Sequence, residues 1–259
     1  MSGDGPKGQR RGQKVVIGYP CGGSVTVPFH ASCLRLLKYE LTKPDSLRLL
    51  GQMTHTSGLY VADNRTLLAQ RFMEAAPEEA DWLLQIDTDI EFPHTLLETM
   101  VALAGTERKI VAANLPLGEG YPTSAFFWET PGRSTVCMRA FPRDADLVEC
   151  DAAATAVMLV HRTVFEDMAK RDGRSWFHHL YMPESSEDTP LEEFNYRSIG
   201  EDVAFCIRAQ RAGHKIYVAR VRGLRHYKAR ALSEDFDFDG VQEDQPTFGP
   251  GMGQLVEER

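Results

Sequence analysis

The sequence lacks any apolar run approaching the roughly 20 residues that a membrane-spanning helix needs. Its N-terminus, which reads Met-Ser-Gly-Asp-Gly-Pro, also lacks the hydrophobic core of a secretion signal. These two absences disfavour a protein held in a bilayer by its own helices. We therefore expect no membrane span and a cytoplasmic location.

Cysteine is scarce and carries no recognisable spacing. The five cysteines are odd in number, widely separated and without a Cys-x-x-Cys pair. A zinc knuckle or a disulfide framework requires paired, closely spaced cysteines, so neither is indicated. We expect reduced and mostly buried thiols.

Positive charge is also in short supply. The chain has 29 Lys and Arg against 37 Asp and Glu, a net charge of -8. Affinity for a nucleic-acid backbone depends on clustered Lys and Arg, so a nucleic-acid-binding role is disfavoured, although a nucleobase as acceptor is not excluded. Most of the acidic excess follows residue 231, where eight acids stand against Arg259 alone.

What the chain does have is length, an ordinary apolar fraction and an alternating pattern. With 259 residues and 42% apolar residues it can bury a core of its own. Periodicity predicts strands that alternate with helices. The strands are predicted over Lys14–Tyr19, Leu47–Met53, Trp82–Ile86 and Lys109–Ala113, and the helices over Val27–Tyr39, Leu59–Ala75 and His94–Ala104. Such alternation indicates an α/β fold with a mainly parallel sheet.

After Asn114 the pattern loosens into shorter strand-like pieces. A strand is predicted over Ala152–Val160 and helices over Thr163–Ala169 and Gly200–Ala212. We therefore expect one domain over 14–231, with a nucleotide-type half to 113 and a second half with a smaller sheet from 114. Residues 1–13 are predicted to be disordered and 232–259 to form a flexible acidic tail.

The most informative motif is Asp87-Thr88-Asp89, which ends the apolar strand Trp82–Ile86. Alternate carboxylates at a strand end can both reach a divalent cation, and ligands of α/β sheets collect beyond the carboxyl ends of the strands. Mg²⁺ or Mn²⁺ held there can bind phosphates. The alternative is that these acids only end a strand or cap the next helix.

A second motif, Gly200-Glu201-Asp202, opens a predicted helix, and His226 follows the next strand. Acids at a helix N-terminus complement its dipole, and a lone His is more often structural than a ligand. The order of the motifs raises the odds of a functional site.

In the order of these motifs along the sequence, the chain resembles the nucleotide-sugar glycosyltransferases of the GT-A fold. The resemblance is in particular to the family 2-like group, which has many bacteriophage and bacterial members. The resemblance covers roughly residues 14–228. It implies that Asp89 binds a metal, that Asp87 contacts ribose or metal, and that His226 completes the coordination. Glu201 and Asp202 would be the catalytic acids, with Asp202 as the general base toward the acceptor hydroxyl, and Asn64-Arg65 would face the nucleotide phosphates.

Weaker matches to the same family add five candidate donor contacts. Pro20 and Gly22 follow the first strand, where the family packs the nucleobase, and Thr54 follows the second. Thr88 lies inside the metal motif, and Ala153 stands where the family usually has Gly near the donor sugar. The aromatic stretch 176–181 is predicted either as an acceptor platform or as a buried cluster.

The resemblance therefore implies a metal-dependent glycosyltransferase that uses Mn²⁺ or Mg²⁺ and a nucleotide-sugar, with a UDP-sugar favoured. An inverting mechanism is favoured over a retaining one. The acceptor is a protein, a glycan or a modified nucleobase, and the host cytoplasm is the location if a phage encodes the chain.

Two readings compete with this one. A haloacid-dehalogenase-like phosphatase expects its Asp-x-Asp after the first strand and Thr or Val two residues further on, where this chain has Glu91. A non-catalytic binder of nucleotide-sugar or glycan would not need the four residues Asp87, Asp89, Asp202 and His226 together.

Overall fold

The computed structural model describes residues 14–21, 23–44, 48–57, 60–76, 80–115, 123–128, 136–138, 141–142, 144–183 and 196–227. Those residues belong to one compact unit that ends at Tyr227. The predicted disordered N-terminus, the predicted acidic tail and Gly22 lie outside the described residues, and so do the side chains of 48–57.

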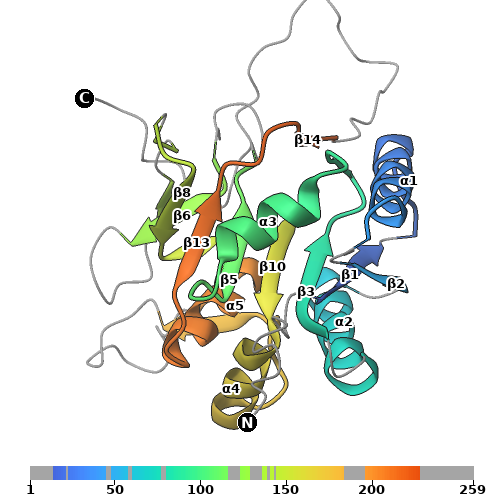
Figure 1. Cartoon of the computed structure of the whole chain (residues 1–259). Coiled ribbons are helices and arrows are strands. Elements are labelled where there is room, and N and C mark those ends of the chain that lie inside the picture. Colours follow the sequence, from blue (N-terminus) through green and yellow to red (C-terminus); the bar gives the residue numbers. More distant parts are fainter. Residues whose placement is uncertain are drawn as a thin grey trace, which may run out of the picture. The chain divides into compact units, whose positions relative to one another are not determined.

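A seven-stranded sheet forms the centre of this unit, in the order β2-β1-β3-β10-β5-β13-β8. Five strands run in one direction, while β10 and β8 run antiparallel to their neighbours. Figure 1 shows β10 pointing against β3 and β5. The strands are β1 (Lys14–Cys21), β2 (Arg48–Ser57), β3 (Ala80–Ile86), β5 (Ile110–Ala113), β8 (Leu147–Cys150), β10 (Val157–His161) and β13 (Ile216–Ala219).

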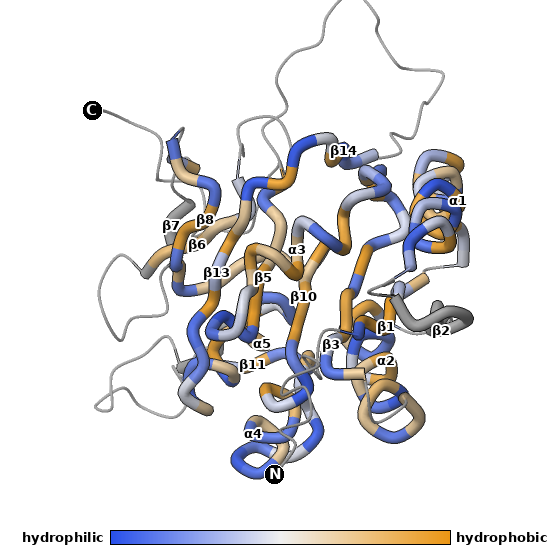
Figure 2. The backbone as a smooth tube through the Cα atoms, viewed as in Figure 1, coloured by the Kyte–Doolittle hydropathy of each residue, from blue (hydrophilic) through white to orange (hydrophobic). Residues whose placement is uncertain are grey.

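Helices cover both faces of the sheet, and each face has its own apolar core. One core joins the strands to α1 (Val27–Leu41) and α3 (Leu96–Ala104). The other joins them to α2 (Val61–Ala75), α4 (Arg162–Asp172) and α5 (Glu201–Arg211). The central strands β3, β5 and β10 are accordingly apolar along most of their length in Figure 2, as expected for strands buried on both faces.

Local chemistry sets several of these elements. The Thr26 hydroxyl accepts from the Phe29 amide and caps α1, which also has a proline in its first turn. Gly18 lets α2 pack directly on β1, because a Cβ there would lie 2.7 Å from Leu68. Gly213, with a φ of 89°, follows α5 in the left-handed conformation that ends many helices.

Three small antiparallel sheets accompany the central one in the described part of the chain. β6 (Ala125–Trp128) pairs with β7 (Val136–Met138) and β9 (Ala152–Ala153). β11 (Leu180–Pro183) pairs with β12 (Tyr196–Ile199). β4 (Ile90–Glu91) pairs with β14 (Arg225–His226), the last described strand.

This architecture confirms the predicted α/β class, with a mainly parallel central sheet and smaller sheets beside it. Two local predictions are wrong. The predicted strand Ala152–Val160 is divided between β9 and β10, which belong to different sheets. The strand predicted over Leu47–Met53 ends too early, because β2 continues to Ser57 and pairs in register there with Gly18–Cys21.

Of the two alternatives for the stretch 176–181, the buried cluster is confirmed for Trp176 and Phe177, and the acceptor platform is wrong for these two residues. Trp176 and Phe177 are buried, with 1% and 0% of their surface exposed. Phe177 stacks on Phe205 of α5, and the Trp176 indole donates to the Phe165 carbonyl of α4. These rings form part of the core, while Tyr181 stays 68% exposed.

Among the described residues, no helix has both the length and the apolar character that crossing a bilayer requires.

Candidate functional site

The predicted motifs meet beyond the carboxyl ends of the parallel strands. Asp87 directly follows β3, and its amide donates to the Ala156 carbonyl just before β10 (2.8 Å). β14 lies beyond the strand ends in Figure 1 and pairs with β4, which follows Asp89. In open α/β sheets this edge is where ligands bind.

Asp87 is bound by a buried arginine from α2. The Arg65 Nη2 atom lies 3.0 Å from Asp87 Oδ2 and 2.9 Å from Oδ1. Only 2% of Arg65 is exposed, so its guanidinium contacts protein rather than solvent. A charge buried this completely is stable only when it is paired and hydrogen-bonded.

The same guanidinium connects Asp87 to the start of α5. Arg65 Nε lies 3.9 Å from Glu201 Oε1 and 4.0 Å from Asp202 Oδ1. Arg65 Nη1 donates to the Thr155 carbonyl at 3.3 Å, and the Thr155 hydroxyl donates to Asp202 Oδ1. One cation therefore serves three carboxylates from two different elements.

Asp89 lies in different surroundings, opposite His226. The distance between Asp89 Oδ2 and His226 Nε2 is 3.0 Å, although the residues are 137 positions apart in the sequence. The Tyr227 amide donates to the Asp89 carbonyl at 2.9 Å, which fixes β14 against the motif. Asp89 Oδ1 is buried and has no hydrogen-bond partner in the described part of the chain.

The electrostatics of the site reflect burial among like charges. Burial raises the pKa of Asp87 to about 6, with Asp202 and Asp89 adding to the rise and Arg65 opposing it. Burial also raises the pKa of Glu201, and the neighbouring Asp202 adds to that shift. The carboxylates of the site thus carry more negative charge than Arg65 alone can offset. This excess favours a ligand that brings positive charge.

The backbone of the motif is held by the start of α1. The Thr26 amide and hydroxyl both donate to the Thr88 carbonyl at 3.0 Å. The Thr88 hydroxyl in turn donates to the Ser24 carbonyl at 3.3 Å. Thr88 therefore links the loop after β1 to the loop after β3.

A divalent cation fits the Asp89 side of the site. No group of three His, Cys, Asp or Glu side chains in the described ranges lies close enough to hold a metal. Asp89 and His226 form a pair of suitable donors, and the buried Asp89 Oδ1 has a lone pair to offer. Mg²⁺ typically takes one or two protein ligands and completes its shell with waters and phosphates, so two ligands suffice.

The other predicted donor contacts are placed less favourably. Pro20 is buried in β1, where it pairs with Thr56, and Asn64 is 2% exposed. Ala153 is fully buried in β9, against Cys206 of α5. Thr54 lies in β2 opposite Gly18, and its side chain is outside the described residues.

Sequence reasoning missed two residues that hold the site together, Thr155 and Thr26. Thr155 gave no signal because its partner Asp202 is 47 residues away and the break between β9 and β10 is not visible in the apolar pattern. Thr26 is the N-cap of α1, and a Thr two residues before a proline was a signal that could have identified the cap.

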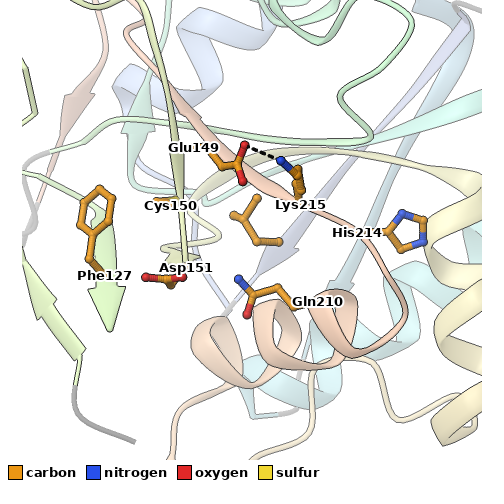
Figure 3. Close-up of a pocket in the computed structure, with 8 residues that line it drawn as sticks. Phe127, Glu149, Cys150, Asp151, Gln210, His214 and Lys215 are labelled. Atoms are coloured by element: carbon orange, nitrogen blue, oxygen red, sulfur yellow. Dashed lines mark hydrogen bonds and ion pairs between the residues drawn. The ribbon is translucent and has the colours of Figure 1, made fainter. Parts of the chain in front are cut away.

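A cavity of about 310 Å³ lies elsewhere, lined by residues of β6, β8, α5 and β13 (Figure 3). Glu149 and Lys215, two of the lining residues, form an ion pair with Nζ and Oε2 3.0 Å apart. None of the predicted site residues lines it. It is therefore separate from the carboxylate cluster.

No protein-family model matches the sequence, and no curated protein matches it either. Among solved structures, the chain is similar to A197 from STIV, with a TM-score of 0.51 and 16% sequence identity. The likeness covers 83% of this chain and 86% of A197. At this identity the likeness supports the fold and says nothing of activity.

Two further structures are less similar. One is a glycosyltransferase involved in the glycosylation of the major capsid of PBCV-1, with a TM-score of 0.35, 13% identity, and 59% of this chain and 62% of that chain covered. The other is 4-diphosphocytidyl-2C-methyl-D-erythritol synthase from Anaerococcus prevotii, with a TM-score of 0.39, 11% identity, and 82% and 90% covered. At these TM-scores neither likeness carries weight for fold or function.

Proposed function

We propose that this protein is a metal-dependent glycosyltransferase that moves a sugar from a nucleotide-diphosphate donor, with a UDP-sugar favoured, to a hydroxyl acceptor. The observation that carries the proposal is the meeting of Asp87, Asp89, Asp202 and His226 at the carboxyl edge of one sheet. These residues come from three distant stretches of the chain and match, in order, the motifs of GT-A enzymes.

On the donor side, Asp89 and His226 would hold Mn²⁺ or Mg²⁺. When bound, such a cation neutralises the charge that grows on a departing diphosphate. Asp87 would contact the ribose or the cation, and its orientation is fixed by Arg65. The net negative charge of the site supports binding a nucleotide together with a cation rather than a nucleotide alone.

On the acceptor side, Asp202 is the group we assign as general base. Its Oδ1 accepts from Thr155, which leaves Oδ2 as the atom that takes the proton, and its side chain is 31% exposed. The acceptor oxygen attacks the anomeric carbon, the bond to the diphosphate breaks with its electron pair, and the proton moves to Asp202. This direct displacement inverts the anomeric centre.

Two alternatives remain as outcomes of the test. A retaining enzyme of the same fold would transfer sugar with the opposite stereochemistry, which NMR of the product would reveal. A non-catalytic binder of nucleotide-sugar or glycan would bind the donor and never turn it over. The acceptor, whether a protein, a glycan or a modified nucleobase, is not specified by the residues of the site.

The test begins with thermal stabilisation by a panel of UDP-, GDP- and dTDP-sugars, each with Mn²⁺ and with EDTA. A ligand that binds only the folded state raises Tm. At a ligand concentration 100 times its Kd, the free energy of unfolding increases by about 2.7 kcal/mol. We expect one nucleotide class to stabilise the protein in the presence of Mn²⁺ only. Release of nucleoside diphosphate from that donor then separates an enzyme from a binder. The proposal fails if no donor stabilises the protein or if none is turned over.

A further inference from the structure

The break between β9 and β10 carries a side chain that contacts the site without being accessible to a ligand. Thr155 lies in this break and is fully buried. Its hydroxyl donates to Asp202 Oδ1 and its carbonyl accepts from Arg65 Nη1 at 3.3 Å. The next carbonyl, that of Ala156, accepts from the Asp87 amide at 2.8 Å. Two consecutive residues thus contact Arg65, Asp202 and the backbone of Asp87.

Arg65 and Thr155 make different kinds of contact with Asp202. Arg65 Nε is 4.0 Å from Asp202 Oδ1, which is longer than a hydrogen bond, so the guanidinium supplies charge but no direction to that carboxylate. The Thr155 hydroxyl is within hydrogen-bond distance. Because threonine is β-branched, its χ1 is restricted, so the position of the hydroxyl oxygen from which the O–H donates is well defined.

From these contacts we infer that Thr155 is a positioning residue for the transfer reaction. Its hydroxyl fixes the rotation of the Asp202 carboxylate, so that Oδ1 is occupied and Oδ2 faces the acceptor. This inference rests on the proposed function, in which Asp202 is the base. Thr155 itself touches no substrate, because none of its surface is exposed.

Three substitutions isolate the hydroxyl. T155V removes the O–H donor at nearly constant volume, while T155S keeps the donor and removes a methyl group. T66V is the matched control. Thr66 is also buried, in α2 beside Arg65, but its hydroxyl has no hydrogen-bond partner in the described part of the chain.

We expect T155V to lower kcat by about 10- to 100-fold, the usual effect of losing a group that orients a functional side chain. The donor Kd should stay within about twofold, since Thr155 does not contact the donor. The acidic limb of the pH profile of kcat/KM should move to higher pH, because a carboxylate that loses a donor binds its proton more tightly. T155S and T66V should keep kcat within about threefold of the unsubstituted protein.

A merely structural role for Thr155 would lower stability without moving the acidic limb. The inference is overturned if T155V transfers sugar at the rate of T155S, or if its acidic limb stays in place. A crystal structure of T155V provides a readout independent of activity, and Asp202 should be rotated away from its original position. If the unsubstituted protein turns over no donor, the proposed function fails. The crystal structure alone then decides whether Thr155 orients Asp202.

Discussion

Asp87 and Asp89 are separated by a single residue at the end of one strand, yet they lie in different surroundings. Both oxygens of Asp87 are within 3.0 Å of Arg65 Nη2, and through Arg65 this carboxylate is connected to Thr155 and to α5. Asp89 faces His226 and keeps a buried oxygen without a hydrogen-bond partner among the described residues. We call Asp87 and its arginine partner the closed region, or Asp87 region, and Asp89 with His226 the open region, or Asp89 region.

The difference indicates that the two carboxylates of one motif have different roles, one in stability and one in ligand binding. In the Asp87 region Arg65 supplies a counter-charge from within the protein, so this ion pair forms without a ligand and should contribute to folding, although Asp87 Oδ1 and Arg65 Nε have no hydrogen-bond partner in the described part of the chain. In the Asp89 region one carboxylate oxygen and one imidazole face each other, and we propose that they hold a cation. We therefore expect substitutions in the first region to change stability and substitutions in the second to change ligand binding.

The largest expected effect is on stability, from R65M. Removing the guanidinium leaves Asp87, Glu201 and Asp202 without their shared counter-charge. Breaking a buried ion pair in this way typically costs about 3–5 kcal/mol. Urea unfolding measures the loss as a lower midpoint.

The control for R65M is R174M. Arg174 pairs with Glu74, and the two side chains are 57% and 58% exposed. Exposed ion pairs contribute about 0–1 kcal/mol, so R174M should unfold close to the unsubstituted protein. Equal unfolding midpoints for R65M and R174M would show that Arg65 is not the counter-charge of the closed region.

The next effect separates the two carboxylates. D89A should weaken Mn²⁺-dependent donor binding by at least tenfold, which is about 1.4 kcal/mol, with little change in Tm. D87A should lower Tm, because it leaves Arg65 buried without its main partner. Calorimetry with and without Mn²⁺, together with thermal unfolding, gives both readouts. The comparison breaks if the two variants behave alike.

His226 provides a finer test of the Asp89 region. H226A should reduce Mn²⁺-dependent binding as D89A does, because both side chains are assigned to one cation. Residues that act as a unit are not additive, so D89A/H226A should bind no more weakly than the weaker of the single variants. Fully additive losses would indicate that the two residues act independently.

The smallest effect is expected at the exposed end of β14. The Tyr227 hydroxyl donates to Glu91 Oε2 at 2.7 Å, on the surface of the protein. Because the β4–β14 backbone pairing and the hydrogen bond from the Tyr227 amide to the Asp89 carbonyl remain, Y227F should lower Tm by no more than about 2 °C. Its Mn²⁺-dependent donor affinity should match that of the unsubstituted protein. A loss as large as that of H226A would mean that the tyrosine hydroxyl, rather than the backbone pairing, holds His226 in place.

Much of the first half of the fold was predictable, because its strands and helices alternate with strong apolar periodicity, as in β1, α2 and β3. The later strands were harder. β9 and β10 are separated by only three small residues, so periodicity merged them into one strand. Aromatic residues such as Trp176 and Phe177 suit an exposed platform and a buried core equally well. Only their packing against α4 and α5 shows that they belong to the core.

The site was predictable as a set of motifs and not as a set of contacts. Asp87 and Asp89 share one motif in the sequence, and nothing in that motif indicates that one would face Arg65 and the other His226. Those contacts depend on how α2, α5 and β14 converge at the sheet edge. The role of Thr155 depends on the same convergence, since a buried threonine is unremarkable in any sequence.

The most direct test of the proposed function compares D202N with the unsubstituted protein, using the donor that stabilises the fold. A general base contributes about 10²–10⁴-fold to the rate, so D202N should bind that donor normally and transfer its sugar at least about 100-fold more slowly. E201Q, which changes the neighbouring acid, should retain more activity than D202N. Transfer by D202N at a rate close to that of the unsubstituted protein would contradict the account.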